Sequence, residues 1–204
     1  MTTHIASRRG PKPNPLIKET LIKAGLNILH TEGYAAAGVQ SIVENAGVPK
    51  GTFYNHFSSK ELFSADVIDE YFALSEKRLI SFLNKTDQPA RARLASYFDD
   101  RIQALAAGGL LRGCLIGNLT AEVADHSELI REKLAEHMNS WSQYFADCIR
   151  AAQSAGEMRN TTDAQVLGRF ILNGWEGALL RMRADKSIEP LLEFKMIIFG
   201  SLLV

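Results

Sequence analysis

The feature that most limits how this chain can fold is the stretch of residues 39–57, in which two short helix-like segments meet at a glycine. Gly47 falls where the chain has to turn sharply, and Val48 can fill the angle between the two segments. Phe53 and Phe57 are four residues apart, so they share one helix face and can anchor the second segment to a core. This spacing predicts a helix-turn-helix, a motif whose second helix can enter the major groove of DNA.

Helical periodicity extends over nearly all of the remaining chain. The first helix is expected to begin with Asn14 as its cap and Pro15 at its first position, and to close at Gly33. No segment alternates with a period of two between hairpin turns, so almost no strand is expected and the predicted fold class is all-α. Further helices are expected over residues 39–46, 49–57, 60–84, 90–107, 113–123, 127–155, 163–183 and 188–203.

Length and cysteine content narrow the setting in which the protein works. The chain has 204 residues and two cysteines, Cys114 and Cys148, which are too few for a disulfide scaffold and agree with a reducing compartment. No run of about 18 uncharged apolar residues is present, and the N-terminus is polar and basic. We therefore expect a cytoplasmic protein with no targeting segment and no membrane partner.

The formal net charge is zero, but the charges are unevenly distributed. Residues 1–60 hold seven basic and three acidic side chains, a net charge of +4, whereas residues 61–204 hold 16 basic and 20 acidic ones, a net charge of −4. Chance segregation is one explanation, and a cationic module that faces a polyanion is the other. Residues 1–13 have the composition of a disordered basic arm, which could reach a minor groove or remain a solvated tail.

Residues 17–72 resemble the DNA-binding part of the TetR family of bacterial regulators. The resemblance is carried by EGY at residues 32–34, AGVPKGTFYNHF at residues 46–57 and SKELF at residues 59–63. Gly38 departs from the family pattern, because a capping Thr or Ser is usual there and glycine offers no hydroxyl to a phosphate. The resemblance implies that the matching positions contact DNA, and these are Gln40, Lys50, Gly51, Thr52, Tyr54, Asn55, His56 and Lys60.

These positions are expected to divide their contacts between the DNA backbone and the bases. Tyr54 and Lys60 are expected mostly at phosphates. The side chains of Gln40, Thr52 and Asn55 are better suited to base edges.

The resemblance also implies a domain organisation and a function. An N-terminal helix-turn-helix domain of three helices would occupy residues 14–75, and a helical domain that binds a ligand and dimerises would occupy residues 76–204. The implied function is that of a transcription regulator, normally a repressor, which a small-molecule inducer releases from a palindromic operator in double-stranded DNA. No enzyme activity, cofactor or metal site is expected, since the five histidines do not cluster with cysteines or carboxylates at ligand spacing.

The last two helices have the apolar pattern of an interface. The resemblance implies that they pair with their copies in a homodimer, which would place two recognition helices about 34–36 Å apart, one turn of DNA. The side chains expected along the interface are Leu167, Phe170, Ile171, Gly174, Ala178 and Met182, followed by Leu191, Leu192, Phe194, Ile197, Ile198 and Leu202.

Aromatic side chains are the candidate lining of a ligand cavity between the bundled helices, although ordinary core packing is the alternative for each of them. The candidates are Tyr97, Phe98, Trp141, Tyr144, Phe145, Phe170 and Trp175. The residues predicted to bind or sense the ligand are Trp141, Phe145 and Trp175, together with Arg112 and Cys114.

A second resemblance involves the sequence around Cys114. RGCLIGNL at residues 112–119 and GWEGALLR at residues 174–181 resemble the branch of the family that contains acrylate-responsive regulators and electrophile-responsive repressors of N-ethylmaleimide reductase operons. In that branch, the cysteine of the Gly-Cys-Leu motif is associated with sensing reactive compounds. One expectation is that a helix start at Cys114, with Arg112 nearby, lowers the pKa of the thiol and makes it reactive. The alternative is a buried, inert cysteine that packs as a small hydrophobic side chain. Cys148 is expected to be structural.

Three hypotheses about the C-terminal domain remain open. The inducer could be a small unsaturated acid that binds reversibly, with Arg112 or Arg181 as its carboxylate partner. It could instead be an oxidant or electrophile that modifies Cys114 covalently. The third hypothesis, a small helical enzyme in which Cys114 pairs with His126 or His137, lacks any further catalytic motif. In the first two, the helix over residues 60–84 joins the domains and is the expected lever of the switch.

Overall fold

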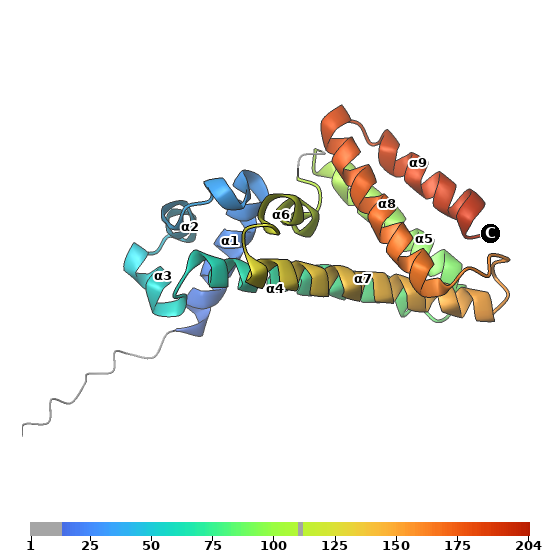
Figure 1. Cartoon of the computed structure of the whole chain (residues 1–204), viewed down its shortest axis with the longest axis horizontal. Helices are drawn as coiled ribbons and strands as arrows, with labels where there is room; N and C mark the ends of the chain where they lie inside the picture. The colour runs from blue at the N-terminus through green and yellow to red at the C-terminus, as the bar shows by residue number, and fades with distance from the viewer. Residues whose placement is uncertain (1–13, 110–111) are drawn as a thin grey trace, which may run out of the picture.

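The chain folds as a bundle of helices in this computed structural model, which describes residues 14–109 and 112–204 (Figure 1). No strand occurs within these residues, so the all-α prediction is confirmed, and none of the helices there is long and apolar enough to cross a membrane. The arm expected over residues 1–13 lies outside the described residues. The helices are α1 (Pro15–Ala36), α2 (Val39–Ala46), α3 (Lys50–His56), α4 (Lys60–Leu83), α5 (Ala90–Ala107), α6 (Leu115–Val123), α7 (Glu128–Ser154), α8 (Ala164–Asp185), α9 (Glu189–Ile197) and the π-helix η1 (Ile198–Leu202).

Side-chain caps explain where several helices begin. Asn14, Ser59 and Asp163 each accept a backbone N–H from the first turn of the helix that follows, at 3.0–3.1 Å. Such a cap satisfies one of the N–H groups that a helix start leaves without a partner. The starts of these helices therefore follow from short-range sequence, and they agree with the prediction to within about two residues.

The end of α1 differs from the prediction. Gly33 was expected to close the helix, but helical structure resumes after it and continues to Ala36. Gly33 itself has φ 80° and ψ 176°, a region that is essentially restricted to glycine. The extra turn has a physical cause, because its free N–H groups at Tyr34 and Ala35 are accepted by the carboxylate of Glu122 in α6.

The helix-turn-helix consists of α2 and α3, joined through Gly47 at φ 66°. Phe53 and Phe57 are buried, as their spacing predicted, and both pack against Phe63 of α4. The ring centroids of Phe53 and Phe63 are 5.1 Å apart, and those of Phe57 and Phe63 are 4.9 Å apart. This aromatic cluster fixes the recognition helix to the start of α4.

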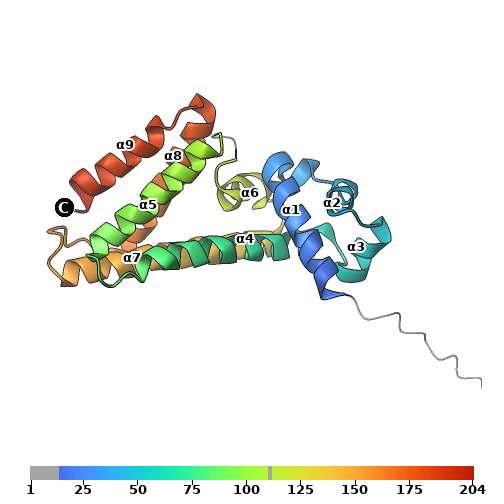
Figure 2. The same ribbon diagram turned by 180° about the vertical axis from the view of Figure 1, so that it is seen from behind.

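The longest helices, α4 and α7, lie side by side and connect the two ends of the molecule (Figures 1 and 2). His137 of α7 bonds to Asp69 of α4 at 2.7 Å, and the hydroxyl of Tyr144 donates to Glu76 at 2.7 Å. Through α4, one continuous helix runs from the recognition motif into the C-terminal half. At the far end α5 and α8 pack with α7, and α9 packs on α8 and α5, while α6 lies against α1 (Figure 2).

The last helix ends differently from the prediction. A regular helix was expected to about residue 203, but α9 ends at Ile197 and the backbone widens into η1. The guanidinium of Arg91 donates to the carbonyl groups of Phe199 and Leu203. These carbonyls thus have a partner outside the helix, which accounts for a widened final turn.

The predicted interface face was wrong in part. Leu167, Ile171 and Met182 of α8 are buried within the protomer, at 3%, 0% and 0% exposure, because they pack into the core of the bundle. Leu191 and Ile198 are buried as well. Exposed apolar side chains do remain on the two helices, and they are Val166, Phe170, Leu180, Leu192, Met196 and Ile197.

Candidate DNA-binding surface and ligand cavity

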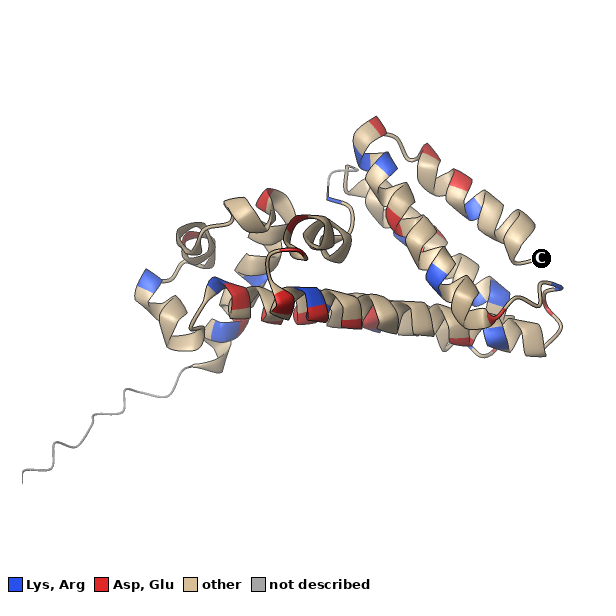
Figure 3. Ribbon diagram, in the orientation of Figure 1, with Lys and Arg blue, Asp and Glu red and all other residues tan. Residues whose placement is uncertain are grey.

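The outer face of α3 and the start of α2 expose the polar side chains that the sequence singled out. Thr52 and His56 are half-buried beside them. Basic residues lie at the outer end of the helix-turn-helix and on α1, whereas acidic residues gather near the adjoining ends of α4 and α7 (Figure 3). The exposed members of the predicted DNA-contact set are Gln40, Lys50, Gly51, Tyr54 and Asn55.

Gly38 stands at the N-cap of α2 and makes no side-chain cap. Its carbonyl accepts the Ile42 N–H at 3.2 Å and the Ser41 hydroxyl at 2.8 Å. The helix therefore starts without the hydroxyl that Thr or Ser would supply, and a neighbouring serine is bonded to the same carbonyl.

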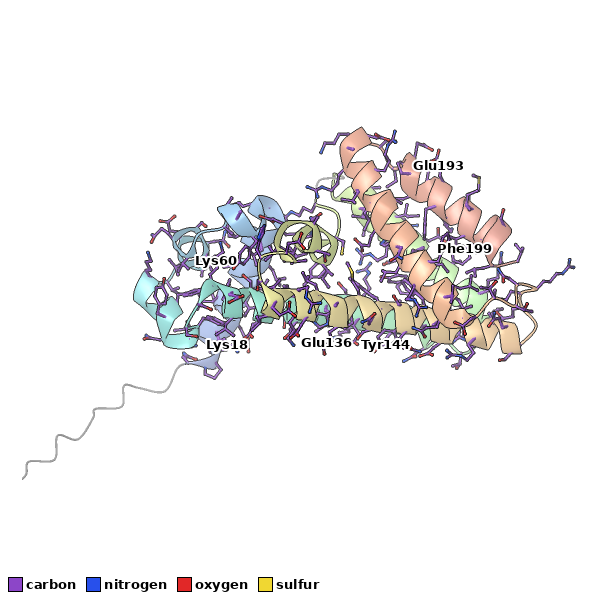
Figure 4. All side chains as sticks on the ribbon, viewed as in Figure 1. Lys18, Lys60, Glu136, Tyr144, Glu193 and Phe199 are labelled. Carbon is purple, nitrogen blue, oxygen red and sulfur yellow. The ribbon has the colours of Figure 1, made fainter. Side chains whose placement is uncertain are left out.

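Lys60 was expected to contact a phosphate, but its ammonium group is bound within the protein. Its ammonium group donates to the carbonyl of Tyr34 at 2.6 Å and lies 4.3 Å from the centre of the Tyr34 ring. Burial lowers the pKa of Lys60, which a nearby Glu122 partly opposes. The residue connects the start of α4 with the end of α1, and in this conformation its charge is directed at α1. Figure 4 labels Lys60 in this part of the molecule.

A cavity of about 420 Å³ lies in the C-terminal half and extends to α1. Its walls include four of the aromatic side chains that the sequence singled out, Tyr97, Trp141, Phe145 and Trp175. The structure brings together all five predicted sensing residues here, because Arg112 and Cys114 also line the cavity. Other predicted residues are elsewhere: Phe98 is buried in the core, Phe170 is 58% exposed, and Tyr144 is bonded to Glu76 (Figure 4).

Polar groups that the sequence did not single out also line the cavity. They are His30 of α1, Tyr71, Ser75 and Arg78 of α4, Arg101 of α5 and Glu176 of α8. Glu176 belongs to the GWEGALLR run, so a signal for it was present, but nothing in the sequence indicated which helix its carboxyl would face. Arg181, from the same run, is exposed and bonded to Asp185 at 2.6 Å, which corrects its predicted role as a carboxylate partner in the cavity.

Cys114 caps α6, as expected of a helix start, but its chemistry differs from the prediction. The thiol is 6% exposed, and burial, followed by the charge of Glu176, raises its pKa well above the ordinary range. The Gly117 N–H, 3.5 Å from Sγ, opposes this only weakly. Arg112 donates to Asn27 at 3.2 Å. The expectation of a lowered thiol pKa was therefore wrong, because desolvation outweighs the helix dipole.

Glu176 lies against the first turn of α6. A Cβ atom on Gly117 would be 2.2 Å from Oε2 of Glu176, so the missing side chain makes the space that this carboxyl occupies. Burial raises the pKa of Glu176 to about 7, and the neighbouring Cys114 thiol opposes that shift.

The second cysteine, Cys148, lies outside the cavity lining. Burial raises the pKa of Cys148 to about 11, and its thiol donates to the carbonyl of Ala90 at 3.1 Å.

The helix α6 connects the cavity with the DNA-binding end. At its start Cys114 faces the cavity, and the preceding Gly113 carbonyl accepts from His30 of α1 at 3.2 Å. Near its end Glu122 holds the backbone of Tyr34 and Ala35 at 2.8 and 2.6 Å. Both ends of α6 are therefore hydrogen-bonded to α1, so a displacement of α6 at the cavity would also displace α1.

No catalytic or metal constellation accompanies Cys114. Neither His126 nor His137 lines its cavity, and His137 is instead bonded to Asp69. Among residues 14–109 and 112–204, no group of three His, Cys, Asp or Glu side chains is arranged to hold a metal ion.

A helix-turn-helix with an exposed polar recognition helix, joined by a continuous helix to a domain with a cavity, defines a DNA-binding regulator that responds to small molecules. The comparisons agree. Residues 21–65 match the family of bacterial regulatory proteins named tetR, and residues 90–197 match the tetracyclin repressor-like C-terminal domain. The chain belongs to the TetR family, whose members are transcriptional regulators and not enzymes.

The relatives include named regulators of similar length. The transcriptional repressor DhaR of Mycobacterium sp. (strain GP1) is 35% identical, over 92% of this chain and 92% of its own length. The regulator AcuR of Cereibacter sphaeroides is 36% identical, over 91% and 85%. The repressor NemR of Escherichia coli K12 is 25% identical, over 85% and 87%. The predicted resemblance to this branch is confirmed.

A solved structure supports the fold directly. A regulatory protein TetR from Rhodobacter sphaeroides superposes with a TM-score of 0.86 at 33% identity, covering 93% of this chain and all of that one. The division between domains at residue 75 is not tested by these similarities and stays a prediction.

Proposed function

We propose that this protein is a repressor that a small molecule, held in the cavity beside α6, releases from a palindromic operator. The observation that carries the proposal is the placement of the cavity, whose lining extends from the C-terminal helices to His30 of α1. A ligand that prefers a form with differently spaced recognition helices must lower operator affinity by the same coupling factor, typically about 5–150-fold. DhaR and NemR, which are named as repressors, support the direction of control.

The operator would be contacted by the exposed face of α3 and the start of α2. Lys50 and Tyr54 are suited to phosphates, and Gln40 and Asn55 to base edges. The apolar side chains exposed on α8 and α9 support a homodimer through these helices, as is typical of the family. In the switch, α4 carries the movement from the cavity, and α6 ties that movement to α1.

Selection of bound DNA from a random double-stranded pool tests the proposal. We expect one palindromic sequence to be enriched, and its affinity to fall steeply with salt as phosphate contacts release counterions. Addition of a ligand that quenches the cavity tryptophans should then weaken the complex. Enrichment of no sequence, with only weak binding to every DNA, would contradict the proposal.

Covalent modification of Cys114 is the second candidate for the switch, because the thiol lines the cavity next to a carboxyl group that can accept its proton. Addition to an activated alkene would form one C–S bond, break the C=C π bond and move the thiol proton to the neighbouring carbon. The raised pKa of Cys114 keeps the free thiol protonated, so this route depends on proton transfer to Glu176.

The variant Cys114→Ser separates the two candidates. If induction is covalent, this variant should bind the operator normally and fail to respond to an electrophile, and intact-protein mass spectra of the wild type should show the adduct. Retained induction in Cys114→Ser would exclude the covalent route. Cys148→Ser, which changes a cysteine outside the cavity lining, is the matched control.

A further inference from the structure

Glu176 is an unusual group to find in the wall of a ligand cavity. It is half-buried, and within the described residues it forms no ion pair with a lysine, arginine or histidine. It is hydrogen-bonded to the thiol of Cys114, which in turn is hydrogen-bonded to the hydroxyl of Tyr71. A buried carboxylate without a counter-charge repels other anions strongly, since little solvent screens the interaction.

The basic side chains of the cavity are not paired with Glu176, and none of them is among the groups that shift its pKa. Arg78 is bonded to both carboxylate oxygens of Asp100 at 2.5 Å. Arg112 donates to the amide oxygen of Asn27. Arg101 of α5 also lines the cavity, and like Arg112 it forms no ion pair within the described residues.

The same cavity offers hydrogen-bond donors that do not depend on charge. The indole N–H of Trp141 is buried and has no acceptor among the described residues. A buried donor of this kind gains a partner when a ligand brings an oxygen to it, and a carbonyl or hydroxyl oxygen of an uncharged ligand does so without repulsion from Glu176. Glu176 in its protonated form is a second such donor.

We propose that the carboxyl group of Glu176 determines the ligand class at the α6 end of the cavity, so that uncharged molecules with a hydrogen-bonding oxygen bind beside Cys114 and organic anions are excluded from that position. This inference rests on the proposed function only in taking the cavity as the ligand site. It replaces the expected unsaturated acid by an uncharged compound of similar size, such as an amide, ester, ketone or alcohol.

The exclusion of anions depends on pH, because Glu176 gains and loses its charge near pH 7. Burial raises the pKa of Cys114, Tyr71 and Tyr97, so these three groups stay protonated and uncharged up to pH 8. Burial lowers the pKa of His30, which favours its uncharged form. The charged groups of the surrounding elements are Arg78, Arg101, Arg112 and Arg183, which stay cationic.

The chain contains the reporter that the test needs, since its two tryptophans, Trp141 and Trp175, both line the cavity. Quenching of tryptophan fluorescence gives the Kd of matched probe pairs that differ only in charge: butyramide and butyrate, cyclohexanecarboxamide and cyclohexanecarboxylate, phenylacetamide and phenylacetate. At pH 8 we expect the amides to bind the wild type about tenfold tighter than their carboxylates, or more. At pH 6, where the probes keep their charges, the difference should shrink at least threefold.

The variant Glu176→Gln removes the charge and keeps the shape. In it, the carboxylates should gain affinity until each pair differs by less than about threefold, and the dependence on pH should vanish. Glu193→Gln, on the outer side of α9 and outside the cavity lining, should behave as the wild type (Figure 4). Equal affinity of amides and carboxylates for the wild type at pH 8, or quenching by neither, would overturn the inference.

These outcomes are distinct from a failure of the proposed function. Amides that quench fluorescence but leave operator affinity unchanged would count against the switch and support the role of Glu176. Carboxylates that bind as tightly as amides and release the operator would support the switch and count against the role of Glu176. The wild-type comparison between pH 6 and pH 8 tests the inference even if Glu176→Gln fails to fold.

Discussion

The carboxylate of Glu122 in α6 accepts the backbone N–H of Tyr34 at 2.8 Å, joining residues that are 88 positions apart in the chain. The same carboxylate accepts the N–H of Ala35, so one side chain caps the turn of α1 that follows Gly33. Charged acceptors make stronger bonds to backbone N–H groups than neutral ones do. Glu122 is therefore the main polar contact between α6 and the DNA-binding end.

Replacing Glu122 by alanine should lower the free energy of unfolding by about 1–2 kcal/mol, because water can replace only part of what the carboxylate supplies. Urea titration followed by circular dichroism measures the change. Glu132→Ala, which changes an exposed glutamate of α7, should alter stability by less than about 0.5 kcal/mol. Equal stability of the two variants would show that the Glu122 contact contributes nothing.

Gly33→Ala should be more damaging than its small size suggests. At φ 80° and ψ 176° a side chain is strained, and its Cβ would lie 2.8 Å from Oε2 of Glu122. The expected cost is about 1–3 kcal/mol of unfolding free energy. Gly51→Ala, within α3 and with no atom near its added Cβ, should instead stabilise by up to about 1 kcal/mol. Thermal denaturation of both variants distinguishes them by sign.

Lys50 and Asn55 should affect operator binding in different ways. If Lys50 contacts a phosphate, Lys50→Ala should weaken binding to all sequences and reduce the slope of log K against log salt by about 1. Asn55→Ala should keep the slope and relax the preference at one or two base pairs, by about 1–3 kcal/mol. Lys77→Ala, on the exposed middle of α4, serves as the charge control. An unchanged salt slope in Lys50→Ala would exclude the phosphate contact.

The stability of the wild type should fall as the pH rises from about 5 to 8. Glu176 ionises near its ordinary pKa of 4.5 in the unfolded chain, but only near 7 in the fold. Its contribution is therefore complete below pH 4.5 and is lost as the pH passes through 7, by at most about 3 kcal/mol. In urea titrations at pH 5 and pH 8, Glu176→Gln should lose less stability than the wild type. Parallel losses in both proteins would assign the pH dependence to other groups.

Charge placed on the exposed apolar face of α8 and α9 should break the dimer. Phe170 is 58% exposed and Met196 is 64% exposed in the protomer, so Phe170→Glu and Met196→Glu should leave the fold intact. Sedimentation velocity should then report monomers, with much weaker operator binding, since half of the contacts are lost. Leu129→Glu changes an exposed leucine of α7 and should remain dimeric. Dimers in both test variants would place the interface elsewhere.

Much of the fold could be predicted because its signals are local. Asn14 and Asp163 cap helices as expected, and the predicted helix over residues 90–107 agrees with α5. Neither signal depends on a distant part of the chain. The end of α1 could not be predicted, because the turn after Gly33 exists only where Glu122 reaches it from α6.

The cavity was predictable in its residue types but not in its electrostatics. Trp141 and Trp175 were identified as members of a group of bulky, partly polar side chains that is larger than helix packing requires, although core packing was the alternative for each residue. The pKa of Cys114 was predicted in the wrong direction, because the helix dipole can be read from sequence and burial cannot. The position of Glu176 required the close approach of α8 to Gly117, a contact between helices that no local pattern encodes.

In the proposed switch, one end of α6 takes part in ligand sensing and the other end in the response. At one end the surroundings are side chains contributed by α4, α5, α7 and α8, and at the other Glu122 holds main-chain groups, which any sequence would offer. Substitutions that reshape the cavity thus leave the mechanical output in place. Relatives could therefore respond to different compounds and keep the same contact between α6 and α1. The ligand specificity of this protein could likewise be changed, for use as a biosensor, by substitutions at Trp141, Trp175 or Glu176 alone.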